Sequence, residues 1–217
     1  MSKQGKFIVL EGVDGSGIST QAELLKNWIS ENYEIFGKTH FTKEPTDGPI
    51  GSLIRQALSK RLKPLDERVM ALLFAADRLD HLTCSAKYDQ MPGINELLEQ
   101  GINVICDRYY LSSFAYQSIG SNLDWVREIN RYARKPDLVI FLHIPVQESV
   151  KRRQKARFHE ELYENEDYLS KIRLNYLDIC QKLQAEGQAI VTIDGSRDKQ
   201  EVLRDIQQAI LSLFPKK

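Results

Sequence analysis

Short apolar runs alternate along this chain with longer segments in which apolar residues recur at helical spacing. Residues 7–11, 39–43, 103–107, 138–144 and 189–194 predict five strands, apolar at consecutive positions and rich in Val and Ile. That composition is typical of strands covered on both faces. Two helical stripes lie between them, Leu53, Ile54, Ala57 and Leu58 and then Val69, Leu72, Leu73 and Ala76, and a third, Val202, Ile206, Ala209 and Ile210, follows the last strand. The alternation predicts an α/β fold with a parallel sheet of about five strands, flanked by helices on both faces. We expect one domain over residues 1–217.

A glycine-rich loop follows the first predicted strand and precedes a helical segment. Its residues are Gly12, Val13, Asp14, Gly15, Ser16, Gly17, Ile18, Ser19 and Thr20. This frame is that of a P-loop, in which backbone N–H groups and a helix N-terminus bind phosphate, and it predicts the three-layer P-loop NTPase fold. Ser19 stands where a hydroxyl would bind Mg²⁺. The alternative is a turn of structural use only, which the flanking strand and helix disfavour.

Position 18 departs from the P-loop pattern G-x-x-x-x-G-K-[ST], because Ile18 stands where the pattern has lysine. That lysine bridges the β- and γ-phosphates of the donor. Loss of one such electrostatic group typically costs about 10²–10³ in rate. Three interpretations stay open. Another cation takes the place of the lysine, the chain binds nucleotide without catalysis, or the substitution was introduced to trap a complex.

Polar residues also follow the second and third predicted strands. Glu44 and Pro45 come after the second, and Asp107, Arg108 and Tyr109 come at the end of the third. Because ligands bind beyond the carboxyl ends of parallel strands, we expect these residues to meet the glycine-rich loop in one crevice. An acid at the end of a buried strand beside a P-loop can hold Mg²⁺. The alternative is that Asp107 pairs with Arg108 or caps the next helix.

Three arginines and one aromatic ring are candidate substrate groups. Arg55, Arg78 and Arg108 could each grip a phosphate or a base edge. Phe74 lies four residues before Arg78, so both share a helix face and could stack and bond a base. Taken alone, such a ring is more often core and such an arginine more often solvated. The basic run 151–157 is either a solvated helix face or a lid that brings cations onto a transferring phosphoryl group. We assign no histidine a catalytic role.

Composition disfavours several other classes of protein. The chain has 217 residues, with 30 Lys and Arg against 30 Asp and Glu, so we expect no field over the whole surface that attracts nucleic acid or a membrane. No apolar run approaches the length of about 20 residues that spans a membrane. The first strand begins too early for a signal peptide. The three cysteines lack metal-ligand spacing, so we expect reduced thiols and a cytoplasmic location.

The ordered set of motifs resembles the thymidylate kinase (dTMP kinase) family. The resemblance rests on the strand and loop at 7–21, on Thr42-Lys43-Glu44-Pro45 with Gly51 and Arg55, on Leu73-Phe74-Ala75-Ala76-Asp77-Arg78, on residues 107–117, and on Ile193-Asp194-Gly195-Ser196. The most specific motif is residues 107–117, which contain Asp107-Arg108-Tyr109, Ser112-Ser113 and Ala115-Tyr116-Gln117. The match covers nearly the whole chain.

The resemblance implies a role for each matching residue. Asp14 would meet the sugar 3′-hydroxyl of the acceptor nucleotide, Arg55 and Arg108 would hold its phosphate, and Glu44 would organise the side near the metal. Phe74 would stack on the base and Arg78 would bond its edge. Ser112, Ser113 and Gln117 would line the base pocket, and Tyr116 would disfavour a 2′-hydroxyl. Ser19 and Asp107 would hold the magnesium ion.

The resemblance also implies where a catalytic arginine comes from. In this family it belongs to the P-loop or to a lid, and Gly15 occupies the P-loop position here. A lid around residues 150–165 would therefore supply it, from Arg153 or Arg157 in preference to Arg152.

The implied reaction is transfer of the γ-phosphoryl group of MgATP to dTMP, which gives dTDP and ADP for dTTP biosynthesis. ATP and Mg²⁺ would be the cofactors, and the resemblance implies a homodimer. A phosphate monoester has a second pKa of about 6 and needs no strong general base. The alternative is a catalytically impaired nucleotide-binding homologue. A GTPase-like switch is disfavoured because no Asn-Lys-x-Asp motif occurs, and a nucleic-acid binder is disfavoured by the balanced charge.

Overall fold

Five parallel strands form the centre of the computed structural model, which describes residues 4–85, 92–156 and 166–214. The strands are β1 (Phe7–Gly12), β2 (Thr39–Lys43), β3 (Asn103–Asp107), β4 (Leu138–His143) and β5 (Ile190–Asp194). Their order across the sheet is β2-β3-β1-β4-β5. Each strand that the sequence predicts is present, and the predicted all-parallel sheet is confirmed.

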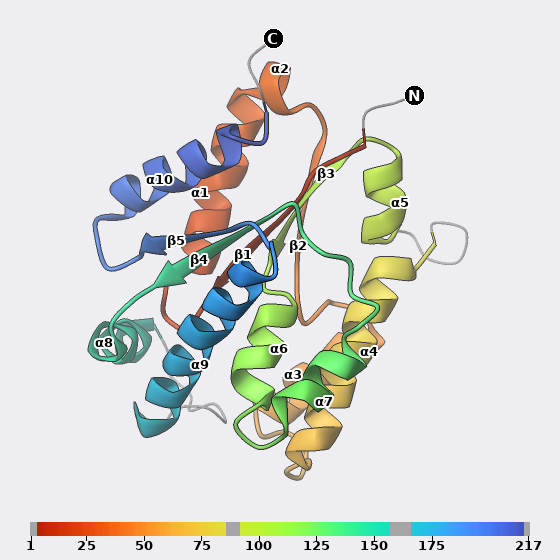
Figure 1. Cartoon of the computed structure of the whole chain (residues 1–217), viewed down its shortest axis with the longest axis vertical. Coiled ribbons are helices and arrows are strands. Elements are labelled where there is room, and N and C mark those ends of the chain that lie inside the picture. Colours follow the sequence, from red (N-terminus) through yellow and green to blue (C-terminus); the bar gives the residue numbers. More distant parts are fainter. Residues whose placement is uncertain (1–3, 86–91, 157–165, 215–217) are drawn as a thin grey trace.

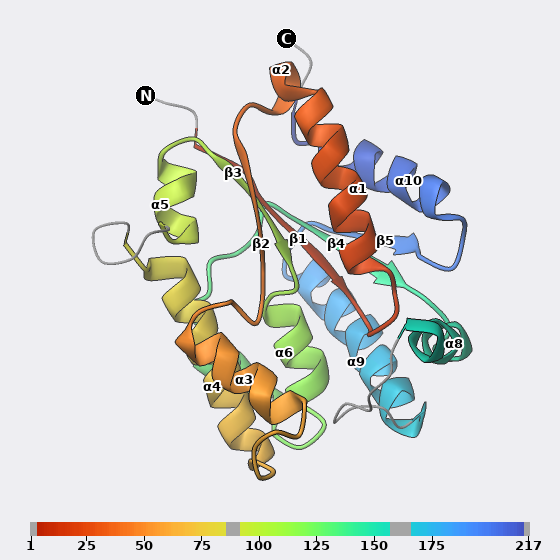
Figure 2. The same cartoon turned by 180° about the vertical axis from the view of Figure 1, so that it is seen from behind.

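Helices connect the strands and cover both faces of the sheet (Figures 1 and 2). They are α1 (Ile18–Glu31), α2 (Tyr33–Phe36), α3 (Pro49–Leu58), α4 (Glu67–Thr83), α5 (Ile94–Glu99), α6 (Tyr110–Gln117), α7 (Leu123–Ile129), α8 (Val146–Ala156), α9 (Glu166–Ala185) and α10 (Lys199–Leu211). The helices α1 and α10 pack on one face of the sheet, and α5, α6 and α9 pack on the other. The predicted three-layer architecture is confirmed.

Alternate side chains of β1 enter two separate apolar layers. Ile8 and Leu10 belong to the cluster that contains residues of α1 and α10. Phe7 and Val9 belong to the cluster that contains residues of α5, α6 and α9. All of β1 is buried, including its one acid, Glu11. The neighbouring strands β3 and β4 also supply residues to both clusters, so the centre of the sheet is packed on both faces, where removal of apolar surface from water stabilises the fold.

The register of the sheet aligns the carboxyl ends of neighbouring strands. Asp107 in β3 lies opposite Lys43 in β2 and opposite Leu10 in β1. Gly12, at the end of β1, lies opposite Leu142 in β4. The loops that leave these strands therefore begin side by side at the edge of the sheet where α/β proteins bind ligands.

The prediction that the strands are covered on both faces was wrong for the two edge strands. β2 and β5 are not covered on both faces, and Val191 of β5 is 38% exposed. In α4 the apolar stripe is divided: Val69 and Leu72 are exposed, Leu73 packs against the small cluster that α3 and α4 form, and Met70 and Ala71 on another side are buried. Apolar residues occur on two faces of α4, so helical spacing alone could not identify the face that packs.

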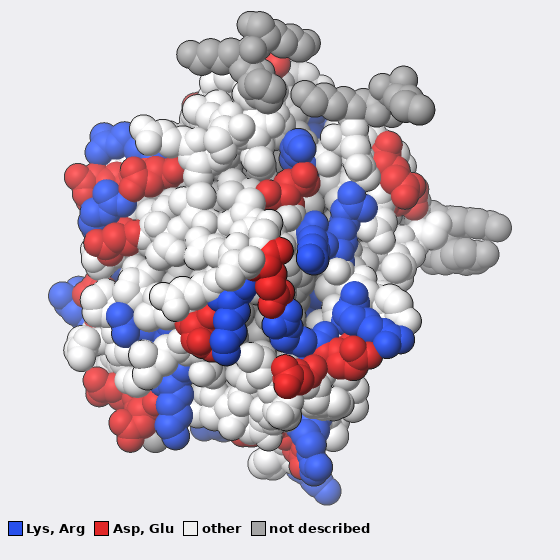
Figure 3. All heavy atoms as spheres, viewed as in Figure 1, with Lys and Arg blue, Asp and Glu red and all other residues white. Residues whose placement is uncertain are grey.

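Acidic and basic side chains are interspersed over the face seen in Figure 3, as the formal net charge of zero leads one to expect. Within the described ranges no helix has both the length and the apolar character needed to cross a membrane. Cys106 and Cys180 are buried free thiols.

Candidate active site

The glycine-rich loop turns between the end of β1 and the start of α1. Gly15 and Gly17 have φ angles of 80° and 95°, a left-handed conformation that glycine adopts at no steric cost. Gly12 is required for another reason, because a Cβ there would lie 2.5 Å from Ser16 Oγ. The Ser16 hydroxyl is buried and has no hydrogen-bond partner among the described residues. A loop of this shape, with the N-terminus of α1 behind it, fits a bound phosphate.

Ser19 and Asp107 form the candidate magnesium site. Ser19 Oγ donates a hydrogen bond of 3.0 Å to Asp107 Oδ2, so the first turn of α1 meets the end of β3. Burial raises the pKa of Asp107, and the charge of Arg108 opposes that rise. A hydroxyl and a carboxylate are oxygen ligands of the kind that Mg²⁺ prefers, and the pair therefore fits the ion.

Arg108 joins the end of β3 to the glycine-rich loop. Its φ of 68° is left-handed, which is uncommon for a residue other than glycine. The guanidinium donates to the Gly12 carbonyl oxygen at 2.9 Å and pairs with Asp14 Oδ1 at 2.6 Å. The Tyr116 ring centroid lies 5.7 Å from the guanidinium carbon, and the Tyr116 hydroxyl accepts a 3.2 Å bond from the backbone N–H of Asp14. Residues predicted from separate motifs are thus in contact.

Glu44 and Arg78 form a buried ion pair near the end of β2. Glu44 Oε2 is 2.9 Å from Arg78 Nη2, and the two side chains are 3% and 2% exposed. Glu44 Oε1 is 3.2 Å from His81 Nδ1, and His81 Nε2 is 2.8 Å from Thr42 Oγ1. The Arg78 guanidinium carbon lies 5.2 Å from the centroid of the Tyr109 ring. These contacts fix the orientation of Arg78.

Glu44, His81 and Cys106 each bring one possible metal-ligand atom within 4.8 Å of the others. Nitrogen and sulfur ligands suit softer ions than Mg²⁺. Burial raises the pKa of the Cys106 thiol, whose S–H donates to the Arg108 carbonyl oxygen at 3.1 Å. A protonated thiol is a poor ligand, so Ser19 and Asp107 remain the better candidate site for Mg²⁺.

Arg55 is bound to the loop that follows β2. Its guanidinium donates to the Pro45 carbonyl at 3.1 Å, to the Thr46 carbonyl, and to Ser52 Oγ at 3.1 Å. Asp77 holds the same loop, because its carboxylate accepts from the Thr46 backbone N–H at 2.8 Å and from the Thr46 hydroxyl at 2.6 Å. The Arg55 side chain is still 38% exposed, so part of its fork of donors can meet a ligand.

Phe74 is half-buried in α4. Its ring packs against the small apolar cluster of Ile54, Ala57 and Met70, which α3 and α4 form together. Arg78, one turn further along α4, is nearly inaccessible to solvent. The ring is thus partly a core residue, and the remainder of its surface is accessible.

The helix α6 carries polar atoms that the protein leaves unsatisfied. Ser113 Oγ and Gln117 Oε1 are buried, and the part of the chain that the structure describes offers them no hydrogen-bond partner. A buried polar atom in this state is costly unless a ligand or water bonds it. Ser112 differs, since its Oγ donates to Glu11 Oε2 at 2.6 Å and accepts from Arg108 Nη1 at 3.3 Å. Its hydroxyl is therefore occupied by protein groups.

Two arginines of α8 lie beside the glycine-rich loop. Arg152 Nη1 is 3.8 Å from the point where a Cβ on Gly17 would stand, and Arg153 Cγ is 3.2 Å from the corresponding point on Gly15. Arg152 Nη1 also donates to the Gly195 carbonyl oxygen at 2.9 Å. The remainder of the predicted lid, from Arg157 through residue 165, lies outside the described residues.

Ile18 contributes nothing polar to the loop. Its side chain is 4% exposed and belongs to the apolar cluster between the sheet, α1 and α10. A cation that faces the phosphates must therefore come from another residue.

Three residues of this region were missed by the sequence reasoning. They are Glu11, Asp77 and His81. A single acid inside the apolar strand Phe7–Gly12 was a signal that could have identified Glu11. His81 lies three residues after Arg78 and so shares its helix face.

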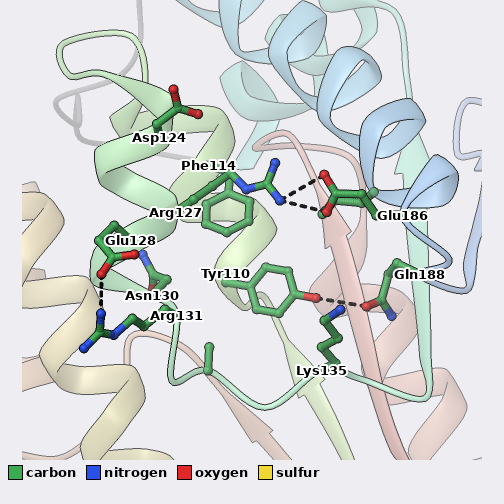
Figure 4. Close-up of a pocket in the computed structure, with 12 residues that line it drawn as sticks. Tyr110, Phe114, Asp124, Arg127, Glu128, Asn130, Arg131, Lys135, Glu186 and Gln188 are labelled. Atoms are coloured by element: carbon green, nitrogen blue, oxygen red, sulfur yellow. Dashed lines mark hydrogen bonds and ion pairs between the residues drawn. The ribbon is translucent and has the colours of Figure 1, made fainter.

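A cavity of about 390 Å³ lies elsewhere, between α6, α7 and the end of α9 (Figure 4). Several charged groups that line it are paired with one another. Arg127 lies 2.7 Å from Glu186, and Arg131 lies 2.5 Å from Glu128. No residue predicted for the site lines this cavity, and we do not assign the reaction to it.

The fold and this site define a protein of the P-loop class, with a glycine-rich loop and a cluster of polar residues at the adjoining strand ends. The family model for thymidylate kinase matches residues 10–206, and the chain belongs to the thymidylate kinase family. The probable thymidylate kinase of Pyrococcus abyssi is 43% identical over 185 residues, which cover 82% of this chain and 84% of that protein. The probable thymidylate kinase of Methanobrevibacter smithii is 36% identical over 207 residues, which cover 94% and 93%.

A solved structure supports the same assignment. The structure of thymidylate kinase from Candida albicans matches with a TM-score of 0.77 and 26% identity, over 96% of this chain and 92% of that one. The predicted fold and family are confirmed.

Proposed function

We propose that this chain is a thymidylate kinase that transfers the γ-phosphoryl group of ATP, bound with Mg²⁺, to dTMP. The observation that carries the proposal is the contact of Arg108 with Gly12 and Asp14. It sets a guanidinium from the end of β3 directly beside the phosphate loop. Two phosphate groups, one from each nucleotide, can meet there. Family membership supports dTMP as the acceptor.

The acceptor phosphate would bind between Arg108 and Arg55. Both guanidiniums are anchored to backbone carbonyls, so they are already oriented before substrate arrives. Fixed positive groups of this kind lower the barrier because they need no reorganisation as charge moves. Asp14, which pairs with Arg108, would accept a hydrogen bond from the sugar 3′-hydroxyl.

The thymine base would lie between Phe74 and α6. The unsatisfied atoms Ser113 Oγ and Gln117 Oε1 support a polar ligand there, and Arg78 would bond the base edge from its fixed position. Tyr116 is held against the Asp14 backbone, where its ring would crowd a ribose 2′-hydroxyl. Glu44 would hold Arg78 in its orientation. Ser112 would act here through Arg108.

The donor triphosphate would bind along the glycine-rich loop and the first turn of α1. Ser19 and Asp107 would hold Mg²⁺, which when bound neutralises charge on the β- and γ-phosphates. The acceptor phosphate is a dianion near neutral pH. The chain therefore needs to position and neutralise the two phosphates, and no basic side chain has to remove a proton.

We propose that arginines of α8 replace the lysine that the P-loop pattern places at position 18. Arg152 and Arg153 both lie against the loop glycines, whereas Ile18 is in the core. Arg157, which belongs to the same basic run, is a further candidate. A guanidinium remains charged at every physiological pH and can bond two phosphate oxygens at once.

A coupled assay of ADP release with dTMP, dUMP, dGMP and dCMP tests the function. We expect turnover with dTMP to exceed turnover with either purine or cytidine nucleotide by at least about tenfold in kcat/KM. Preference for dGMP would refute the assignment of the acceptor. Tight binding of ATP and dTMP by calorimetry without any ADP release would support the alternative, an impaired nucleotide-binding homologue, which the isoleucine at position 18 favours.

We also propose that two copies of the chain pair through α3 and α4. Leu53 is 39%, Val69 43%, Leu72 50% and Leu79 43% exposed, and these residues lie on two helices that pack together. An exposed apolar face of this kind is typical of a protein interface. Light scattering on wild type and a Leu72→Asp variant tests this. We expect a dimer for wild type and a monomer for the variant, and a monomeric wild type would exclude pairing.

A further inference from the structure

Glu11 is a buried carboxylate that the proposed reaction does not use. It precedes Gly12 in β1 and is 0% exposed. Its Oε1 accepts from the backbone N–H groups of Tyr109 at 2.9 Å and Ser112 at 3.2 Å. Its Oε2 accepts from the hydroxyls of Ser112 at 2.6 Å and Tyr176 at 3.0 Å. A carboxylate that four donors surround in the interior is costly to bury, and its partners indicate what it does.

The bonds to Oε1 fix the turn at Arg108. The N–H groups of Tyr109 and Ser112 belong to the start of α6, where the N-cap residue supplies no side-chain acceptor. Glu11 therefore satisfies the N–H of Tyr109, which the helix N-terminus would otherwise leave unpaired, and it shares the N–H of Ser112 with the Tyr109 carbonyl oxygen, which accepts from that N–H at 3.1 Å. Arg108 immediately precedes this start, and its left-handed φ of 68° persists only if its neighbours hold it.

The hydrogen bonds to Glu11 Oε2 connect this carboxylate to the Arg108 guanidinium through Ser112. Ser112 Oγ accepts from Arg108 Nη1 at 3.3 Å while it donates to Glu11 Oε2 at 2.6 Å. The hydroxyl has one proton, so donating it to Glu11 leaves its lone pairs free for Arg108. A hydrogen-bonded chain thus runs from the guanidinium through Ser112 to the carboxylate.

We infer that Glu11 is a positioning residue for phosphoryl transfer, because it holds both the backbone and the side chain of Arg108 in the orientation that reaches the phosphate loop. The inference rests on the proposed function, in which Arg108 binds the acceptor phosphate. The positioning requires Glu11 to be ionised, because a carboxylate only accepts hydrogen bonds. A protonated acid or an amide carries a hydrogen of its own, which would be directed at the hydroxyl hydrogens of Ser112 and Tyr176.

The titratable groups that face Glu11 come from β3, α6 and α9. Burial raises the pKa of Glu11 to about 7, and the hydrogen bond from Ser112 and the charge of Arg108 oppose that rise. Burial also raises the pKa values of the neighbouring thiols and phenols, which therefore stay neutral through the physiological range: Cys106, Tyr110, Tyr176 and Cys180. Glu11 is the member of this cluster whose charge changes near neutral pH.

The test compares Glu11→Gln with Asp137→Asn in the full chain. Asp137 is a matched control, because its carboxylate, like that of Glu11, accepts a hydrogen bond from a backbone N–H. Its donor is Phe7 at 2.8 Å, which lies at the end of β1 opposite to Glu11. We expect kcat/KM for dTMP to fall at least about tenfold in Glu11→Gln, with KM for ATP changed less than about twofold. Asp137→Asn should change neither by more than about twofold. The acid limb near pH 7 in the wild-type profile of kcat/KM for dTMP should be absent from Glu11→Gln.

A double-mutant cycle separates positioning from general support of the fold. In an Arg108→Met background, Glu11→Gln should cost less than about twofold further, because the group through which it acts is gone. An undiminished loss in that background would overturn the inference, as would an acid limb that persists near pH 7 in Glu11→Gln. The limb from the second ionisation of the dTMP phosphate, near pH 6, is expected in both proteins. If Glu11→Gln does not fold, Ser112→Ala breaks the same chain and must show the same coupling to Arg108. Absence of dTMP turnover in wild type would refute the proposed function, whereas normal kinetics of Glu11→Gln would refute this inference alone.

Discussion

The buried carboxylate of Glu11 also predicts an unusual dependence of stability on pH. Its pKa is about 7 in the folded protein, against an ordinary value of 4.5, because burial disfavours the charged form. Between these two pH values the folded state keeps the proton and the unfolded state loses it. The folded state thus binds more protons, and the free energy of unfolding falls as pH rises. The contribution is fully present below pH 4.5 and is lost as pH passes 7.

The size of the effect follows from the two pKa values. One pKa unit corresponds to about 1.4 kcal/mol, so a rise from 4.5 to about 7 removes about 2–3 kcal/mol between pH 5 and pH 8. This is a large fraction of the stability of a typical domain. Glutamine at position 11 does not titrate, and the other groups cancel when the two proteins are compared at each pH. The stability of Glu11→Gln relative to wild type should therefore increase by about 2–3 kcal/mol over this range.

Urea unfolding of both proteins at pH 5, 6, 7 and 8, followed by circular dichroism, measures this difference. The pH-independent cost of rearranged hydrogen bonds shifts all four points equally and does not affect the slope. A difference that stays constant within about 0.5 kcal/mol would show that Glu11 titrates normally and would refute the reasoning. The predicted result would mean that the carboxylate opposes folding at the pH where it orients Arg108, as groups at functional sites often do.

Three further predictions concern the other parts of the site and the core. Arg152→Met should lower kcat about 10²–10³-fold, because its guanidinium is expected to face the phosphates. The control Lys151→Met, on the same helix and 65% exposed, should change kcat less than about twofold. Equal effects of the two substitutions would count against a specific role for Arg152. Asp107→Asn should raise the Mg²⁺ concentration for half-maximal rate at least about tenfold, and an unchanged requirement would place the ion elsewhere. Ile206→Ala in α10, where the side chain is 0% exposed, should cost about 2–5 kcal/mol in urea unfolding with dTMP kinetics little changed, and a loss below about 1 kcal/mol would contradict the packing described.

The sheet and the glycine-rich loop could be predicted because each has a local signal. Consecutive apolar residues mark β1, β3 and β4, and glycines with a strand before and a helix after mark the loop. The convergence of Asp14, Glu44 and Arg108 followed from the rule that parallel strands align their carboxyl ends. In this chain the register that pairs Leu10 with Asp107 places the carboxyl ends of β1 and β3 side by side.

The partners of each charged group could not be predicted in the same way. Arg78 was a candidate substrate group, but its buried ion pair with Glu44 was not predicted, because residues distant in sequence enclose it. The face by which α4 packs was also hidden, since Leu72 and Met70 lie on different apolar sides of one helix. Such features depend on tertiary packing, which spacing along the chain does not encode.

The central claim is that a loop without a lysine still delivers a phosphoryl group to dTMP. Incubation of the protein with Mg²⁺, dTMP and ATP labelled at its γ-phosphorus, followed by separation of the nucleotides, tests it directly. We predict that the label appears in dTDP in amounts equal to the ADP formed. Label released as inorganic phosphate, or ATP that stays intact while both nucleotides are bound, would contradict the account.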